Sequence, residues 1–312
     1  MNTLHLKYAV EVERTGSITQ AADNLYMGQP NLSKAIRELE DQMGIVIFKR
    51  SSRGVVPTRK GTEFLRCAKR ILAQIDEMEM LYRSEPSNRQ RISVSAPRGS
   101  YISHAFSCFI GELDQAREIE ADFNETSSVT TISRVSEGAS NLGIIRYQTI
   151  YEEHFMKLLK DKGLITEPVW EYESLALMSR NHPLAQTAKL KSEQLDDCVE
   201  LVHGDSGIPY LSGFSQKRDD RRKVSAKRIT IYERGSQFDL LTEIPSTYMW
   251  VSPVPETTLR RYDLVQRRCE CSDNKYKDML IYANDYTLSE YDRGFIRTLF
   301  RVRDELAARQ YA

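Results

Sequence analysis

Amide and basic side chains gather on one side of a short segment that begins near residue 29. Asn31, Lys34 and Arg37 recur at three-residue steps, which favours one face of a helix. Such groups donate hydrogen bonds to phosphates and to base edges in the major groove of DNA. The opposite arc of the segment is apolar and comprises Leu32, Ile36, Leu39 and Met43. This distribution predicts a helix that buries one side and presents the other to DNA.

The residues before this segment predict a second helix and a tight turn that hold it in place. Ser17, followed three residues later by Gln20, predicts a reciprocal N-capping pair. The turn at 26–28 contains a glycine, and Pro30 falls in the first helical turn, where its missing N–H costs little. Two such helices form a helix-turn-helix, although ordinary helical domains also contain this pattern.

A basic hairpin is predicted directly after the second helix. Residues 44–48 are mainly apolar, residues 49–54 are basic with a glycine, and residues 55–58 are apolar again. A hairpin with a basic tip can follow phosphates or enter the minor groove. The segment therefore favours the winged variant of the helix-turn-helix.

The motifs of this region recur without a gap at one consistent spacing. They are residues 6–8, 16–17, 21–25, 29–33, 36–40, 43–44, 48–50, 53–54, 57–58 and Gly61. With these motifs, residues 1 to about 87 resemble the amino-terminal region of LysR-type transcriptional regulators. One departure is Gly28, because that family usually has a serine there. Glycine is a tolerated N-cap, but it removes a hydroxyl that could contact the DNA backbone.

The resemblance implies a regulator that binds double-stranded DNA as a dimer or tetramer and influences RNA polymerase. The candidate DNA contacts on the helices are Ser17, Gln29, Pro30, Asn31, Ser33, Lys34 and Arg37, and those on the wing are Arg50, Ser52 and Arg53.

A long helix with a narrow apolar seam is predicted between the wing and the rest of the chain. Its apolar residues are Leu65, Ala68, Leu72, Ile75 and Tyr82, with Met78 on the flank. Such a seam seeks another helix, and the resemblance implies that the partner is the same helix of a second subunit. Packing against its own chain is the alternative. Pro86 predicts the helix end.

From residue 91 onward, apolar strands alternate with amphipathic helices, which predicts α/β layers with a mainly parallel sheet. Residues 167–168, 180–185 and 295–296 also resemble the effector-binding part of the LysR family, although residues 141–144 depart from its usual motif. The resemblance implies two α/β lobes, like periplasmic binding proteins. The expected domains are a winged helix-turn-helix at 1–58, a linker helix at 59–87 and an effector domain at 88–312, with lobe one at 91–164 plus 268–306 and lobe two at 165–267.

Polar loops after the predicted strands suggest where a ligand binds. In open sheets of this kind, ligands bind beyond the strand ends, near helix N-termini. The candidate residues are Arg98, Ser100, Ser127, Ser128, Arg146, His203, Ser206, Arg234 and Ser236. Their hydroxyl and guanidinium groups favour a small anionic effector, such as a carboxylate, held by Ser100, Ser128 and an arginine. Serines are equally common as plain helix caps.

Composition and the remaining motifs narrow the function further. Basic residues outnumber acidic ones in the first 91 residues and are outnumbered afterwards, which suits a DNA-binding head joined to a sensor. The chain has no continuous apolar run that suggests a signal peptide or membrane span, so a cytoplasmic protein is expected. The basic run at 217–223 is interpreted as a solvated loop rather than a second nucleic-acid patch.

Three alternatives remain open at this point. Cys198 could make the protein a redox-sensing regulator, whereas the Cys269 and Cys271 pair is interpreted as isolated thiols rather than half of a zinc site. A DNA-binding head fused to a catalytic α/β domain would need acid, base or nucleophile motifs, and none stands out, so no enzyme, cofactor or metal is expected. A mainly architectural DNA binder is the third alternative.

Overall fold

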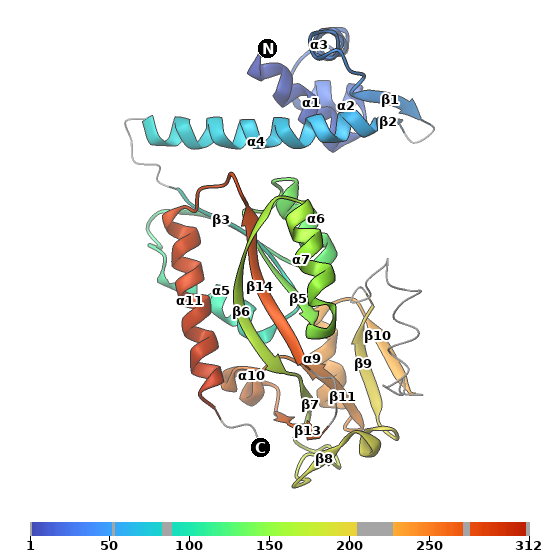
Figure 1. The fold of residues 1–312 in the computed structure, drawn as a ribbon, viewed down its shortest axis with the longest axis vertical. Helices are drawn as coiled ribbons and strands as arrows, with labels where there is room; N and C mark the ends of the chain where they lie inside the picture. The colour runs from blue at the N-terminus through green and yellow to red at the C-terminus, as the bar shows by residue number, and fades with distance from the viewer. Residues whose placement is uncertain (1, 52–53, 83–88, 205–226, 271–274, 310–312) are drawn as a thin grey trace. The chain divides into compact units, whose positions relative to one another are not determined.

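The structure is a computed structural model, and it describes residues 1–312 except 1, 52–53, 83–88, 205–226, 271–274 and 310–312. The chain divides into two compact units between Asn88 and Arg89. Figure 1 shows a helical first unit, with a small hairpin and one long helix, and an α/β second unit. Each unit has its own apolar core.

The first unit is a winged helix-turn-helix, as the sequence predicts. Its elements are α1 (Thr3–Thr15), α2 (Ile18–Asn24), α3 (Gln29–Met43), β1 (Phe48–Ser51), β2 (Gly54–Pro57) and α4 (Arg59–Tyr82). Leu32, Ile36 and Leu39 of α3 are buried together with apolar residues of α1 and α2. Met43, predicted to share this face, is 41% exposed, because α3 ends there and the chain turns away at Gly44.

The helix-turn-helix corner follows the predicted signals with one difference. The Ser17 side chain accepts a hydrogen bond from the Gln20 backbone N–H and so caps α2. The reciprocal half of the predicted pair is absent, because the Ser17 backbone N–H donates instead to Thr15 Oγ1 at 3.3 Å. The Gln20 amide donates to Asn24 Oδ1 at 3.1 Å. Pro30 lies in the first turn of α3, as predicted.

The linker helix α4 buries the first part of its seam within its own unit. Leu65 and Ala68 are almost fully buried in the core formed with α1 to α3, and Leu72 packs against that core. Further along the helix, Ile75 is half-buried and Met78 is 54% exposed. The alternative of packing against its own chain therefore holds for the start of the seam.

The second unit contains two five-stranded sheets. The first has the order β4-β3-β5-β14-β6, and its strands are β3 (Arg89–Ala96), β4 (Glu118–Glu125), β5 (Leu142–Gln148), β6 (Leu164–Glu173) and β14 (Lys275–Ala283). The second has the order β10-β9-β11-β7-β12, and its strands are β7 (Leu175–Ser179), β9 (Val199–His203), β10 (Arg228–Ile231), β11 (Thr247–Val251) and β12 (Leu264–Arg267). We call the parts built on these sheets lobe one and lobe two.

Both sheets are mixed, but in each of them four of the five strands run in the same direction, so the sheets are mainly parallel, as expected. β3 runs parallel to β4 and β5, whereas β14 lies antiparallel between β5 and β6. In lobe two, β9 is parallel to β10 and β11, but β7 is antiparallel to β11 and β12. The antiparallel strands are those next to the two points where the chain changes sheet.

Helices cover lobe one on both faces (Figure 1). α5 (Ser100–Glu112) and α11 (Glu290–Ala307) share one core with the sheet, and α6 (Ser128–Ser136) and α7 (Glu152–Asp161) share another. Lobe two carries α9 (Arg234–Glu243) and α10 (Glu256–Arg261). The short elements are η1 (Thr149–Tyr151), β8 (Leu190–Lys191), η2 (Ser192–Leu195) and β13 (Cys269–Glu270). No helix of the described residues is long and apolar enough to cross a membrane.

The chain passes between the two sheets at closely linked points. Ser174 alone separates β6 from β7. On the return, Arg268 lies between β12 and β13, β13 pairs with β8 in a separate two-stranded sheet, and the first sheet is reached at β14, beyond residues 271–274, which lie outside the described residues. Glu173 Oε2 accepts hydrogen bonds from Arg268 Nε and Nη2 at 3.0 and 2.6 Å, which joins the two passages. Lobe two was expected to start at residue 165, but β6 pairs along its length with β14 of the first sheet. The first strand of lobe two is therefore β7.

Candidate nucleic-acid interface and interlobe site

The polar face of α3 is open to solvent along its first turns. Gln29, Pro30, Asn31, Lys34 and Arg37 are all exposed. Ser33 is half-buried at the edge of this face, and Ser17 is half-buried because it caps α2. Lys34 Nζ lies 3.8 Å from Glu38 Oε1, a surface contact that costs little to exchange for a phosphate.

A carboxylate of α3 fixes the recognition helix against the wing. Glu40 Oε1 accepts hydrogen bonds from the backbone N–H groups of Ile47 and Phe48 at 2.6 and 3.0 Å. Glu40 falls within the motif at 36–40, but the sequence alone does not indicate its role, because its hydrogen-bond partners lie beyond the helix. The orientation of α3 relative to the hairpin therefore depends on one side chain.

The hairpin is held by the end of α1 at the start of β2, next to its turn. β1 and β2 pair antiparallel, with Ser51 opposite Gly54. The Val55 N–H donates to the Gly16 carbonyl at 2.8 Å, and a Cβ on Gly54 would lie 2.6 Å from the same oxygen. Of the predicted wing contacts, Arg50 lies in β1, whereas Ser52 and Arg53 lie outside the described residues.

In the second unit, a side chain of lobe two reaches two residues of lobe one, of which one was predicted. Arg234, the first residue of α9, forms an ion pair with Glu125 at the end of β4. Its second terminal nitrogen donates to Ser100 Oγ at 3.1 Å. The side chains of Arg234 and Glu125 are each 19% exposed. Two of the predicted effector residues are thus brought together, and Glu125, which sequence analysis missed, joins them.

Arg146 was predicted to hold an anionic effector, but the protein supplies its own anion. Arg146 Nε and Nη2 donate to the two carboxylate oxygens of Asp278 at 2.8 and 2.7 Å. Tyr101 donates to the same carboxylate at 2.5 Å, and Tyr172 does so at 3.4 Å. Burial, together with the charge of Asp278, raises the pKa of Tyr101, so it stays a donor. Arg146 therefore belongs to a buried polar cluster rather than to an open anion site.

Ser127 and Ser128 are satisfied locally. The Ser128 hydroxyl donates to the Arg146 carbonyl at 2.7 Å and accepts from the Arg146 N–H at 2.9 Å. Ser127 Oγ accepts from the Thr130 N–H at 3.2 Å, as a helix cap does. Ser127 is thus a helix cap, and Ser128 joins the start of α6 to β5, so both serines have structural contacts.

The other predicted effector residues are dispersed. His203 Nε2 lies 3.1 Å from Gln237 Oε1, beside the start of α9. Arg98 is half-buried, and Ser236 is exposed. Burial raises the pKa of Glu125, and the charge of Arg98 opposes this rise only in part. Ser206 lies outside the described residues.

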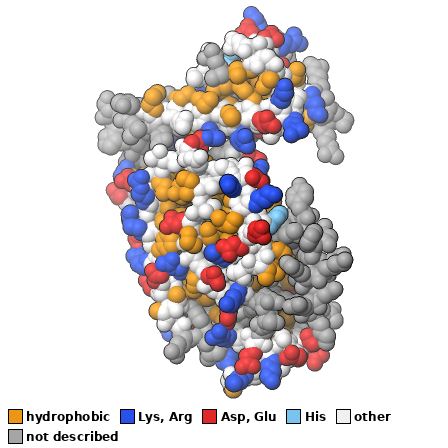
Figure 2. Space-filling model, viewed as in Figure 1, with side chains coloured by type: hydrophobic (Ala, Val, Ile, Leu, Met, Phe, Trp, Pro, Cys, Tyr) orange, Lys and Arg blue, Asp and Glu red, His pale blue; other side chains and the backbone are white. Residues whose placement is uncertain are grey.

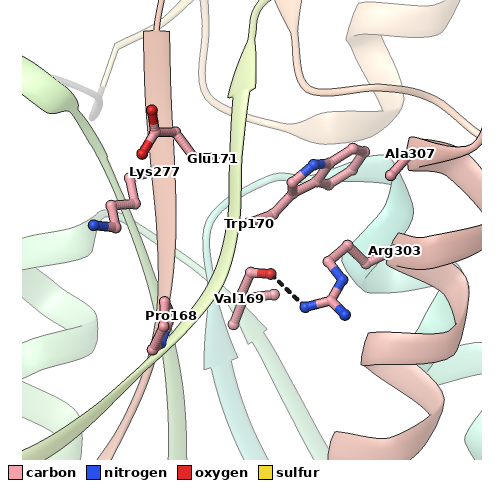
Figure 3. A pocket seen from close by; sticks show the side chains of 7 residues that line it. All are labelled: Pro168, Val169, Trp170, Glu171, Lys277, Arg303 and Ala307. Atoms are coloured by element: carbon pink, nitrogen blue, oxygen red, sulfur yellow. Dashed lines mark hydrogen bonds between the residues drawn. The ribbon is translucent and has the colours of Figure 1, made fainter.

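A groove of about 410 Å³ lies on lobe one, but it is separate from these residues. It is lined by Pro168, Val169, Trp170, Glu171, Lys277, Arg303 and Ala307, and Figure 3 shows Arg303 directed at β6. Arg303 Nη1 donates to the Val169 carbonyl at 2.8 Å, and Lys277 pairs with Glu152 at 2.5 Å. Figure 2 shows apolar, acidic and basic side chains intermixed on the surface of this unit. None of the predicted effector residues lines the groove.

The cysteines give little support to the redox alternative. Cys67 and Cys108 are free thiols, and Cys271 lies outside the described residues. Burial raises the pKa of the Cys198 thiol, which disfavours the reactive thiolate. Within the part of the chain that the structure describes, no group of three or more His, Cys, Asp or Glu side chains could hold a metal ion.

Comparisons with known proteins agree with this architecture. Residues 4–62 match the family model described as bacterial regulatory helix-turn-helix protein, lysR family. The chain is 27% identical to the transcriptional regulator BenM of Acinetobacter baylyi over 216 residues, which is 68% of this chain and 67% of BenM. It is also 27% identical to the uncharacterised regulator YnfL of Escherichia coli over 196 residues, 61% of this chain and 62% of YnfL.

The fold extends over the whole length of a solved relative. The structure of ArgP from Mycobacterium tuberculosis superposes with a TM-score of 0.64, at 17% identity, and the match covers 98% of this chain and 97% of that one. At this identity the likeness concerns the fold. The helical head, the linker helix and the two α/β lobes therefore form one known architecture.

Proposed function

This chain belongs to the LysR family of DNA-binding transcriptional regulators, and we propose that it recognises its operator through the exposed face of α3. Gln29, Asn31, Ser33, Lys34 and Arg37 contact base edges and phosphates, with Pro30 against a sugar or a thymine methyl group. Ser17 and the wing residues Arg50, Ser52 and Arg53 contact the adjacent backbone. The observation that carries this proposal is the exposure of five residues on the polar side of α3, opposite the buried Leu32, Ile36 and Leu39.

Two subunits pair through the linker helices, and two such dimers form a tetramer. The support for this pairing is the later part of the α4 seam, where Met78 is 54% exposed after the intramolecular contacts of Leu65 and Ala68 end. An exposed methionine on the flank of the seam suits contact with a second helix. Pairing places two recognition helices on successive half-sites of a dyad-symmetric operator.

A small molecule bound between the two lobes controls the regulator and its effect on RNA polymerase. Binding that favours one arrangement of the lobes shifts the population of subunit arrangements on DNA. The support for this site is the meeting of Arg234 from lobe two with Ser100 from lobe one. We propose the domains expected from the sequence, a head at 1–58, a linker at 59–87 and an effector domain at 88–312, with β6 moved to lobe one.

Genome-wide occupancy of the full-length protein, followed by footprinting on the strongest sites, tests this function. Protection of an interrupted, dyad-symmetric sequence in two adjacent major grooves is the expected result. Addition of a metabolite of the neighbouring genes should change the length or spacing of the protected region. Uniform occupancy without a shared sequence would favour the architectural alternative, and turnover of a bound metabolite would favour the catalytic one.

A further inference from the structure

The contact between Arg234 of lobe two and Glu125 of lobe one resembles an anion-binding site in which the Glu125 carboxylate is the bound anion. Arg234 presents a planar guanidinium fork, which matches a carboxylate in shape and charge. One arm of this fork meets the Glu125 carboxylate, and the other meets the Ser100 hydroxyl. The three groups come from the start of α9, the end of β4 and the start of α5, so both lobes contribute.

The backbone around this pair also favours a negative charge. Ser100 and Arg234 are the first residues of α5 and α9, and neither helix has a side-chain cap at its N-terminus. The N–H groups at the start of a helix and the helix dipole both attract anions. The positive charge of Arg98 also favours an anion here, since it opposes the rise that burial causes in the pKa of Glu125.

Glu125 fills this position at a cost. Burial raises the pKa of its carboxyl group, and this effect exceeds the opposing effects of Arg234 and Arg98. A buried ion pair is often near neutral for stability, because desolvation offsets the attraction between the charges. A ligand that takes the place of Glu125 returns this carboxylate to water and relieves its desolvation.

We propose that Glu125 is a built-in occupant of the interlobe anion site, and that a carboxylate effector acts by displacing it from Arg234 and Ser100. This proposal rests on the proposed function, because it specifies the effector class and the way the effector site is regulated. Without effector, the Glu125–Arg234 contact joins the lobes through the chain's own carboxylate. With effector, the external carboxylate bridges Arg234 and Ser100, and Glu125 leaves the site.

Removal of the Glu125 charge in the full-length protein tests the displacement. Glu125→Gln keeps the size of the side chain but weakens its competition for Arg234. Acetate and benzoate serve as probes, with acetamide and benzamide as neutral counterparts of the same shape. We expect Glu125→Gln to bind at least one of the acids about tenfold more tightly than wild type by titration calorimetry, a change of about 1.4 kcal/mol. The amides should show no such gain.

Glu118→Gln is the matched control, because Glu118 lies at the other end of β4 and pairs with Arg89 on an exposed surface. This variant should bind the acids as wild type does. Arg234→Gln should abolish acid binding in both backgrounds. Equal acid affinities of wild type and Glu125→Gln, or equal gains for acids and amides, would overturn the proposal.

Two further measurements keep the result interpretable. Amide hydrogen exchange at the start of α9 should rise in Glu125→Gln and fall again with bound acid, and unchanged exchange would contradict the displacement.

If Glu125→Gln does not fold, Glu125→Asp keeps the charge on a shorter side chain and should give a smaller gain in acid affinity. Operator binding by the same variants separates the two proposals, because loss of DNA recognition concerns α3 and not Glu125.

Discussion

Arg146 and Asp278 lie directly opposite each other on the antiparallel strands β5 and β14. Their side chains form a bidentate ion pair, although the residues are 132 positions apart in the sequence. Asp278 is fully buried, and Arg146 is 16% exposed. The pair thus supports the register of two central strands. Because Asp278 already compensates the charge of Arg146, this guanidinium is not available to an anionic ligand.

Loss of one partner of this pair should destabilise the second unit strongly. Asp278→Asn leaves the Arg146 charge buried without a counter-charge, which costs about 3–5 kcal/mol in comparable pairs. Urea unfolding of the second unit measures this cost. The double variant Arg146→Met with Asp278→Leu should recover most of the loss, because neither charge is then buried alone. A double variant as unstable as Asp278→Asn would contradict this account.

Glu40 should prove necessary for the stability and orientation of the head. Glu40→Ala removes both acceptor bonds to Ile47 and Phe48, and hydrogen bonds to a charged group contribute about 1.5–3 kcal/mol each. Thermal unfolding of the first unit should therefore occur at a clearly lower temperature, with weaker operator binding. Glu40→Gln retains an acceptor oxygen and should lose less. Similar losses for both variants would show that the charge alone matters.

Gly61 should tolerate no side chain. A Cβ at this position in the first turn of α4 would lie 2.0 Å from the Ile47 carbonyl oxygen, a backbone atom that cannot rotate away. Gly61→Ala is therefore expected to destabilise the first unit by about 1–3 kcal/mol or more, as overpacking does. Gly111→Ala is the control, since nothing lies within 4 Å of its Cβ, and it should stabilise α5 by about 0.5–1 kcal/mol. Denaturant titration separates the two outcomes.

Arg37 should contribute to sequence recognition if it contacts a guanine. Arg37→Ala is expected to weaken operator binding by about 1–3 kcal/mol and to reduce discrimination at one base pair. Lys7, exposed on α1, provides a control of equal charge change. Fluorescence anisotropy with single-base operator variants measures both. Equal effects of Arg37→Ala on every operator variant would indicate a phosphate contact instead.

Glu11 should make the head sensitive to acid. Hydrogen bonds from Arg14 and from Asn24 of α2 lower its pKa from 4.5 to about 2. Because the folded-state pKa lies below the ordinary value, the stability from this group is complete above pH 4.5 and is lost as the pH falls towards 2. The difference in unfolding free energy between wild type and Glu11→Gln should therefore shrink over this range. A constant difference from pH 5 to pH 2 would contradict the lowered pKa.

Local signals in the sequence predicted most of the head. Leu32, Ile36 and Leu39 recur at helical spacing, and Pro30 marks the helix start, so α3 follows from neighbouring residues alone. The prediction that Met43 belongs to the buried face was wrong, because hydrophobic periodicity does not show where the core beneath a helix ends. The exposure of Arg37 agrees with the predicted polar face, while its contact with DNA remains a prediction.

The interlobe site was predicted less well, for a physical reason. Ser100 and Arg234 were found because both follow strands and begin helices. Glu125 is 109 residues from Arg234, and Asp278 is 132 residues from Arg146, so only the folded sheets bring each pair together. The course of β6 was missed for the same reason, since its place beside β14 depends on a strand more than a hundred residues later.

The two passages between the sheets limit how the effector domain can deform. Ser174 gives the first passage a single residue of slack, and the Glu173–Arg268 ion pair joins it to the second. A change in the relative orientation of the two lobes therefore has to be accommodated at Ser174 and beside the Glu173–Arg268 ion pair, where the two crossings lie together.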